Sequence, residues 1–208
     1  MTTVLSIPKT RVFQLLWAKE ESPAPLIEQF IKSHPLTRSL QVNPRLNESR
    51  PHLNVFESPR SQSRNLLTGV LAGPERISVA PYVFQDPGKS MIMLMHLGNE
   101  MCSHEGIIHG GLLATLLDEC LARCCCPVFE KKVAVTANLN IDYRSPAMAD
   151  SYFVVHAKVT KVLGRKAWVD GWVETLPSER GESTLIAEAK SLFVEPKHAA
   201  GLKGLYNS

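Results

Sequence analysis

The chain has 208 residues, of which 44% are hydrophobic and 21% charged, a composition that predicts an ordinary globular protein built on one main core. Its net charge of +3 is small and scattered, without a run of Lys or Arg that could follow a phosphate backbone, so we expect no nucleic-acid partner. No stretch approaches the roughly 18 to 20 consecutive apolar residues of a membrane span, so we expect none.

The first 64 residues are expected to form an accessory helical extension and a linker. Residues 11–33 carry two short amphipathic patterns separated by Ser-Pro-Ala-Pro, which predicts two small helices packed on the outside of the domain. Residues 41–64 are polar and interrupted by proline, as in a linker or an irregular strap. Three cations and no acid occur in the first 19 residues: Lys9, Arg11 and Lys19.

This charge pattern is a weak feature of a transit peptide and also fits an ordinary extension. No secretory signal with an apolar core and a cleavage site is visible, so we do not expect secretion. The location stays open between the cytoplasm and the mitochondrion.

The remaining segments predict a hairpin, one long helix and four further strands. Residues 76–86 and 90–98 read as strands joined by a Pro-Gly turn, and a helix is predicted from Gly110 to about Cys126, where Pro127 ends it. The four later strand-like segments are residues 133–143, 152–163, 165–176 and 183–195. In the first of these, apolar residues alternate with a polar face that begins at Thr136.

A lone apolar helix followed by antiparallel strands is most simply buried by a sheet that curls around it, which predicts an α+β fold of the hotdog type. Four motifs resemble the hotdog-fold acyl-coenzyme A thioesterases, in particular the thioesterase superfamily member type of animal mitochondria and the related phenylacetate-pathway thioesterases. The motifs are HGGLLATLLDE (109–119), VTANLNIDYRSP (135–146), VLGRKAWV (162–169) and AEAKSLFV (187–194). The resemblance covers about residues 66–195, so we expect an extension (1–64), a hotdog domain (65–196) and a tail (197–208).

Hydrolysis of a thioester needs a positive pole at the carbonyl oxygen and a carboxylate or an activated water at the carbonyl carbon. The amides at the start of the predicted helix, at Gly110 and Gly111, can supply the first because free helix N-terminal amides favour negative charge. The two glycines could instead serve only a tight turn. His109 is expected to hold the substrate or the loop, or simply to cap the turn.

Asp118 and Glu119 are distinguished by their helical neighbours. Glu119 has Arg123 four residues ahead, a spacing that suits a solvent-facing ion pair. Asp118 has only Ala, Thr and Leu at these spacings, and desolvation on such a face should raise its pKa, as expected of a nucleophile or general base. A buried structural carboxylate is the alternative. In the family that the chain resembles, the matching Asp is the catalytic carboxylate.

The resemblance also implies roles for residues outside the helix. Thr136 matches a threonine that orients the carboxylate or the water, although Thr is common in strands. A basic turn at Gly164, Arg165 and Lys166 would contact the nucleotide end of coenzyme A, unless these cations are simply solvated. Arg144 and Asn138 are further candidate substrate contacts.

The five cysteines form a poor disulfide framework, because they are odd in number and four of them lie within residues 120–126. They lack the paired spacing of a zinc site, so we interpret them, together with His104, as packing residues and expect no metal. Met91, Met93 and Met95 either line an adaptable acyl tunnel or belong to the core.

The sequence therefore predicts an acyl-CoA thioesterase of lipid metabolism that needs no cofactor. The alternatives are a hotdog domain that only binds acyl-CoA or a partner protein and, less favoured, a hotdog dehydratase or hydratase, which would need a proton-transferring His. Gly110 and Asp118 lie eight residues apart, roughly 12 Å along a helix, so one chain cannot bring both to one carbonyl. We expect a homodimer, or a tetramer built from it.

Overall fold

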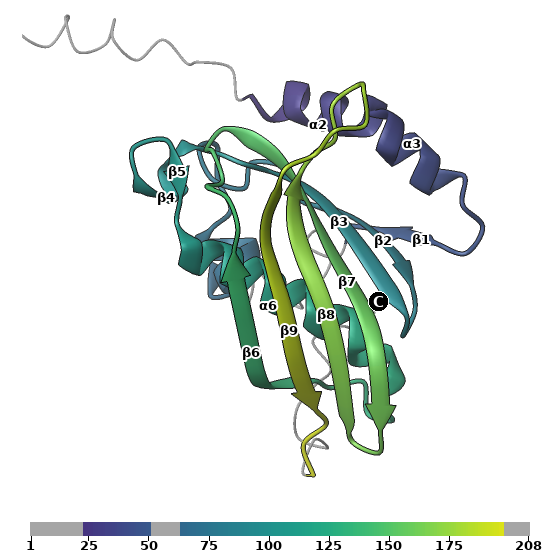
Figure 1. Ribbon diagram of the computed structural model, residues 1–208. Helices are drawn as coiled ribbons and strands as arrows, with labels where there is room; N and C mark the ends of the chain where they lie inside the picture. The colour runs from purple at the N-terminus through teal and green to yellow at the C-terminus, as the bar shows by residue number, and fades with distance from the viewer. Residues whose placement is uncertain (1–22, 51–62, 198–208) are drawn as a thin grey trace, which may run out of the picture.

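The computed structural model describes residues 23–50 and 63–197, and at its centre a single long helix, α6 (Gly110–Cys125), is enclosed by a curved sheet (Figure 1). The strands are β1 (Asn47–Ser49), β2 (Tyr82–Asp86), β3 (Ser90–Leu97), β6 (Val135–Tyr143), β7 (Ser151–Leu163), β8 (Lys166–Thr175) and β9 (Leu185–Val194). They pair antiparallel in the order β1-β2-β3-β7-β8-β9-β6. The predicted hotdog fold, with its hairpin, long helix and four later strands, is confirmed.

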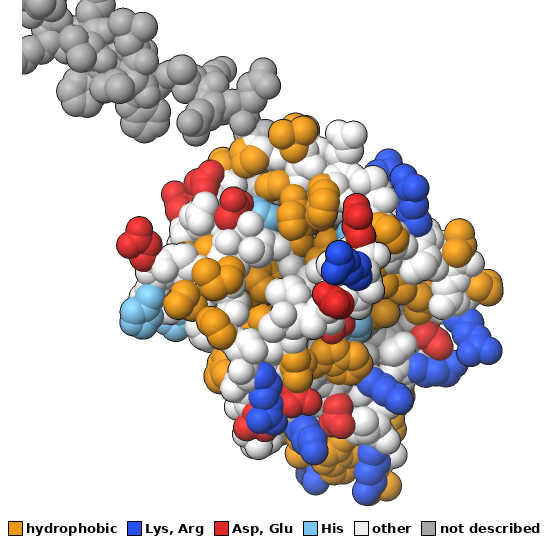
Figure 2. Space-filling model, turned by 45° about the horizontal axis from the view of Figure 1, so that its top comes forward, with side chains coloured by type: hydrophobic (Ala, Val, Ile, Leu, Met, Phe, Trp, Pro, Cys, Tyr) orange, Lys and Arg blue, Asp and Glu red, His pale blue; other side chains and the backbone are white. Residues whose placement is uncertain are grey.

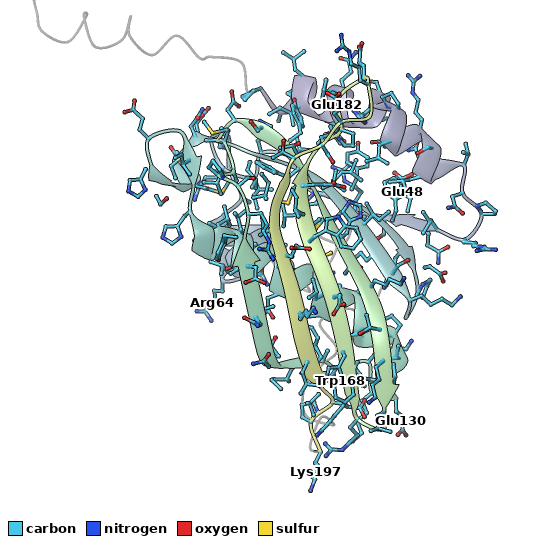
Figure 3. All side chains as sticks on the ribbon, viewed as in Figure 1. Glu48, Arg64, Glu130, Trp168, Glu182 and Lys197 are labelled. Atoms are coloured by element: carbon cyan, nitrogen blue, oxygen red, sulfur yellow. The ribbon has the colours of Figure 1, made fainter. Side chains whose placement is uncertain are left out.

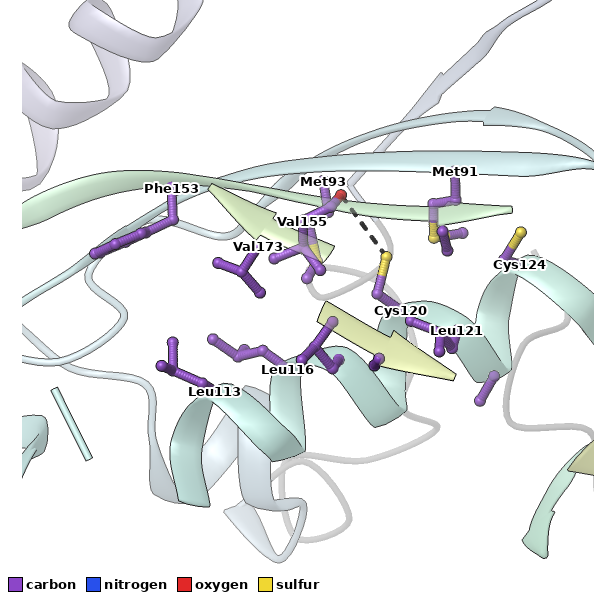
Figure 4. Packing of buried hydrophobic residues seen from close by; sticks show 14 of the residues in the cluster. Met91, Met93, Leu113, Leu116, Cys120, Leu121, Cys124, Phe153, Val155 and Val173 are labelled. Atoms are coloured by element: carbon purple, nitrogen blue, oxygen red, sulfur yellow. Dashed lines mark hydrogen bonds between the residues drawn. The ribbon is translucent and has the colours of Figure 1, made fainter. Parts of the chain in front are cut away.

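The inner face of the sheet packs on α6 through a dense apolar core (Figure 4). Leu116, Leu117 and Leu121 of the helix are fully buried in this core. Gly171 on β8 allows the helix to come close, because a Cβ at this position would lie 2.5 Å from Leu121 Cδ1. The methionines at positions 91, 93 and 95 lie in the same core with at most 2% of their surface exposed, so their interpretation as core is confirmed.

Two N-terminal helices cover part of the opposite, outer face of the sheet. They are α2 (Ala24–Ser33) and α3 (Pro35–Gln41), and a second apolar cluster joins Ile27 and Ile31 of α2 to Phe84 on β2 and Leu94 on β3. The outer faces of β8, β9 and β6 carry no such layer within the described residues. The helix predicted near residues 24–33 is confirmed as α2, whereas the one predicted before it lies outside the described residues.

Several short elements were not predicted. One of them is α3, which begins at Pro35: proline is favourable at the first position of a helix, and the His34 ring caps α3 by accepting the Leu36 N–H at 3.2 Å. The linker contains β1, and the first hairpin strand begins only at Tyr82, after Pro81. The other additions are η1 (Leu66–Val70), η2 (Asn99–Met101), β4 (Cys102–His104), β5 (Ile107–Ile108) and η3 (Cys126–Val128). None of the helices in the described residues has the length and apolar character needed to cross a membrane.

Candidate active site

The first turn of α6 leaves one backbone amide without a partner in the part of the chain that the structure describes. His109 precedes the helix as its N-cap, and its Nδ1 accepts the Gly111 N–H at 2.8 Å. The Leu112 and Leu113 amides both donate to the His109 carbonyl, at 2.9 and 3.3 Å. Among the described residues, none accepts the Gly110 N–H. Within the described ranges the helix start therefore offers a single free donor, at Gly110, and the expectation that the Gly111 amide is also free is wrong.

The His109 cap explains why glycine occupies position 111. A Cβ on Gly111 would lie 2.9 Å from Nδ1 and 3.0 Å from Cε1 of the ring, so a larger residue would displace the cap. The ring nitrogen Nδ1 acts as the acceptor in this cap. The interpretation of His109 as a cap is confirmed.

Tyr143, the last residue of β6, holds the same turn from the other side. Its hydroxyl donates to the Gly110 carbonyl at 2.9 Å, and a Cβ on Gly110 would lie 3.4 Å from the ring. Sequence reasoning missed this role because Tyr143 fits the apolar face of the strand, although 53% of it is exposed. The glycine beside a tyrosine ring could not have been recognised before the two elements were brought together.

Asp118 lies two turns further along α6, where Thr136 of β6 contacts it. The Thr136 hydroxyl donates to Asp118 Oδ1 at 2.7 Å, as the resemblance implied, while Asp118 forms no ion pair with a described residue. The side chain is only partly buried. A single chain therefore does not provide the strong desolvation that the apolar helix face suggested, because one side of Asp118 remains open.

A bulge in β6 brings Thr136 to the helix. Thr136 pairs with Phe193 and Leu139 pairs with Ser191, and these two β9 residues are two apart and share the inner face. Thr136 and Leu139 thus also share the inner face although they are three residues apart, because the register shifts between 136 and 138. The prediction that Thr136 lies on the polar face with Asn138 is therefore wrong.

Glu119 forms the predicted ion pair with Arg123, but not in solvent. Arg123 Nε lies 2.5 Å from Glu119 Oε1, and the two side chains are 9% and 23% exposed. The Arg123 carbonyl also accepts a hydrogen bond from Gln85 on β2. The pair is therefore largely shielded beside the sheet, and the expectation that it faces solvent is wrong.

Asn138 and Arg144 lie on the outer face of the sheet, away from α6. Arg144 is already paired with two acids, at 2.8 Å from Glu188 and 3.4 Å from Asp142. Each of these two predicted contacts lines a shallow hollow on the outer face of the sheet. The hollow at Arg144 has a volume of about 650 Å³ and is also lined by Lys158 and Lys190. In Figure 2 positive and negative side chains are interspersed over the lower part of the molecule. The structure does not bring these two candidates to Asp118.

The predicted basic turn joins β7 to β8. Gly164 has φ +55°, which glycine adopts without strain, and Arg165 donates to the Glu195 carbonyl at 2.7 Å. Across the sheet, Lys166 pairs with Val194, which also pairs with Val135 beside Thr136. The turn therefore lies at the same end of the sheet as Thr136, two strands or roughly 10 Å away. Figure 3 shows a further cation, Lys197, at this end of the sheet.

The cysteines and His104 were all predicted to be packing residues, and the structure bears this out for the clustered cysteines but not for His104. The four cysteines at 120 and 124–126 are buried, and burial raises the pKa of the Cys124 thiol to about 12 and that of Cys126 to about 11, as expected of packing residues. His104 is exposed on β4, where its Nδ1 lies 3.3 Å from the Ser103 hydroxyl, so its assignment to packing is wrong. In the described ranges, no three His, Cys, Asp or Glu side chains gather as metal ligands would.

Two histidines, the buried His96 and the partly buried His156, were not singled out from the sequence. His96 lies 3.1 Å from Asp150 and His156 lies 2.8 Å from Glu174, while the His156 ring stacks on Trp172 at 4.4 Å. Burial lowers the pKa of both histidines despite the neighbouring carboxylates. Both lie on the outer face and take no part in the arrangement at α6.

Comparisons with known proteins find a matching family model and several similar sequences. A family model described as "Thioesterase superfamily" matches residues 105–177, from the loop before α6 to the end of β8. An uncharacterized mitochondrial protein of Candida albicans is 39% identical over 154 residues, which cover 71% of this chain and 69% of that protein. The mouse acyl-coenzyme A thioesterase THEM4 is 34% identical over 107 residues, 51% of this chain and 44% of the relative.

A solved structure shares the fold. The crystal structure of a thioesterase family protein from Silicibacter pomeroyi superposes with a TM-score of 0.51 at 15% identity, covering 65% of this chain and 92% of the other. At this identity the likeness concerns the fold alone.

Proposed function

We propose that this chain, which belongs to the thioesterase superfamily, hydrolyses acyl-CoA to a free acid and coenzyme A. The observation that carries the proposal is the pair on α6 and β6: a partly buried Asp118 with no ion-pair partner among the described residues, oriented by Thr136. A carboxylate held by a neutral donor rather than neutralised by a cation keeps its charge available for chemistry.

The Gly110 amide supplies the complementary pole. It is the unpartnered N–H at the start of a 16-residue helix, where a developing negative charge is stabilised. With the carbonyl oxygen at this amide, Asp118 either takes a proton from the attacking water or attacks the carbonyl carbon itself before water releases the acyl group. In both cases the thioester C–S bond breaks and an oxygen from water is incorporated to give the free carboxylic acid. The coenzyme A thiolate that leaves gains a proton.

His109 has a supporting part in this mechanism. Its Nδ1 accepts the Gly111 N–H, and the proposal assigns this ring no proton transfer of the kind that a dehydratase or hydratase would require. The cap instead keeps the helix start formed.

The distance between the two groups requires a second copy of the chain. Gly110 and Asp118 are roughly 12 Å apart along α6. β6 is an edge strand, and Val135 and Tyr143 on it are 47% and 53% exposed. Two copies related by a twofold axis, with their α6 helices antiparallel, would place each Gly110 amide beside the partner's carboxylate and form two equivalent sites.

Coenzyme A would add contacts at the basic turn. Arg165 and Lys166 lie at the end of the sheet that holds Thr136, and the Arg165 side chain is fixed by the Glu195 carbonyl. Cations held in this way suit the phosphates of the nucleotide. We place the protein in the mitochondrion, in keeping with the name of the Candida relative and with Lys9, Arg11 and Lys19.

The test is a hydrolysis assay with acyl-CoA substrates of increasing chain length. The wild-type chain should release free thiol, and Asp118→Asn should lower turnover at least about 100-fold while it still binds acyl-CoA. Asp142→Asn is the matched control, because this exposed acid lies on the outer face of β6 and should leave the rate unchanged. Binding of acyl-CoA without hydrolysis would identify a binding domain and refute the proposal.

A further inference from the structure

The peptide unit between Gly110 and Gly111 is held at both of its polar ends. Its carbonyl accepts the Tyr143 hydroxyl at 2.9 Å, and its N–H donates to His109 Nδ1 at 2.8 Å. The two side chains come from different elements, since Tyr143 ends β6 and His109 caps α6. This peptide follows directly on the Gly110 amide, so its orientation sets the direction of the free N–H.

Tyr143 contributes little to the core. It is 53% exposed, it lies outside both buried clusters, and even a Cβ added at Gly110 would lie no closer than 3.4 Å to its ring. Its best-defined polar contact is the hydrogen bond to the helix start.

We propose that Tyr143 is a positioning residue, whose hydroxyl fixes the first turn of α6 so that the Gly110 amide points at the thioester carbonyl. This inference rests on the proposed function. A donor that is displaced from the oxyanion loses much of its effect, because the stabilisation depends on preorganised geometry. The hydroxyl would therefore influence the rate of the chemical step more than the binding of substrate.

The test compares Tyr143→Phe with Tyr152→Phe, which removes a hydroxyl from a partly buried tyrosine on the outer face. Because misplacement by 1 Å can cost about 100-fold, we expect the smaller loosening in Tyr143→Phe to lower kcat about tenfold, with KM and Tm nearly unchanged. Tyr152→Phe should leave kcat at the wild-type value. An equal kcat in wild type and Tyr143→Phe would overturn the positioning role while leaving the hydrolase intact.

A second measurement separates positioning from a merely structural role. An acyl-CoA analogue with a methylene between sulfur and carbonyl binds as a ketone that cannot be hydrolysed, and its C=O stretching frequency reports the hydrogen bond from Gly110. We expect the frequency to rise in Tyr143→Phe toward its value in water-free solvent, and to stay unchanged in Tyr152→Phe. An unchanged frequency together with a lower Tm would show that the hydroxyl only stabilises the fold. Failure of the wild-type chain to bind or hydrolyse any acyl-CoA would overturn the proposed function and, with it, this inference.

Discussion

The hydroxyl of Thr136 and the carboxylate of Asp118 are joined by a 2.7 Å hydrogen bond that links the edge strand β6 to the central helix. The second carboxylate oxygen, Oδ2, receives no hydrogen bond from a described residue. The contact therefore fixes one oxygen and leaves the other for substrate or water. Its geometry depends on the bulge that turns Thr136 inward.

Removing the Thr136 hydroxyl should slow catalysis without unfolding the strand. Thr136→Val keeps the shape of the side chain and its preference for strands, and we expect kcat to fall about tenfold because the carboxylate is no longer held in place. Thr136→Ser keeps the donor and should retain most of the activity. Steady-state kinetics with one acyl-CoA measures both, and equal rates in all three proteins would remove Thr136 from the mechanism.

A mixed dimer should recover activity from two inactive variants. Gly110→Pro removes the free N–H and fits the first helical position, because proline is favourable there and His109, with ψ 127°, already has the conformation preferred before proline. Refolded together with Asp118→Asn at equal amounts, random pairing should restore about a quarter of wild-type activity per chain.

Gly110→Ala is the control for the mixed dimer, since it adds a Cβ and keeps the N–H. Mass spectrometry of the mixture establishes that heterodimers have formed. If they have and no activity returns, the amide and the acid do not come from different chains.

Glu119→Gln should reduce stability and spare catalysis. The change takes the Glu119 charge away from the buried Arg123 guanidinium, so we expect the free energy of unfolding to fall by about 2 kcal/mol. Urea denaturation measures the loss, and the rate per folded molecule should match the wild type. A fall in kcat comparable to that of Asp118→Asn would mean that the roles of the two acids have been assigned wrongly.

Replacing both cations of the β7–β8 turn should discriminate between substrates. Arg165→Ala combined with Lys166→Ala should raise KM for acyl-CoA about tenfold, because lost charge-assisted bonds to phosphate are worth roughly 1.4 kcal/mol or more. KM for a short thioester of N-acetylcysteamine, which has no phosphates, should stay the same. Equal changes for both substrates would exclude a nucleotide contact.

Acidification should destabilise the fold through the buried His96 and the partly buried His156. Burial holds the pKa of His96 and His156 below the value of 6.5, near which the unfolded chain takes up its protons. Below about pH 6.5 the unfolded state binds more protons than the folded state, so the free energy of unfolding falls as the pH falls. We expect His156→Gln to lessen this fall between pH 7 and 5, and exposed His104→Gln to leave it unaltered. A pH slope of Tm that His156→Gln does not change would contradict the assignment.

The amino-acid pattern was enough to predict the long helix, the hairpin and the later strands. Those elements follow from local periodicity: Pro127 ends α6, Gly164 turns the chain, and alternating residues mark the strands. The same pattern placed Asp118 on the helix and made its eight-residue separation from Gly110 visible.

Other features were decided only when distant segments met. The bulge in β6 reverses the face of Thr136 because its register is set by pairing with β9, some 55 residues later. The Gly111 amide is occupied because the His109 ring folds back on it, and Tyr143 reaches Gly110 only because β6 runs beside α6. Periodicity records which side chains alternate, whereas the direction of a hydroxyl or an amide depends on the partner that satisfies it, and that partner is chosen by the tertiary fold.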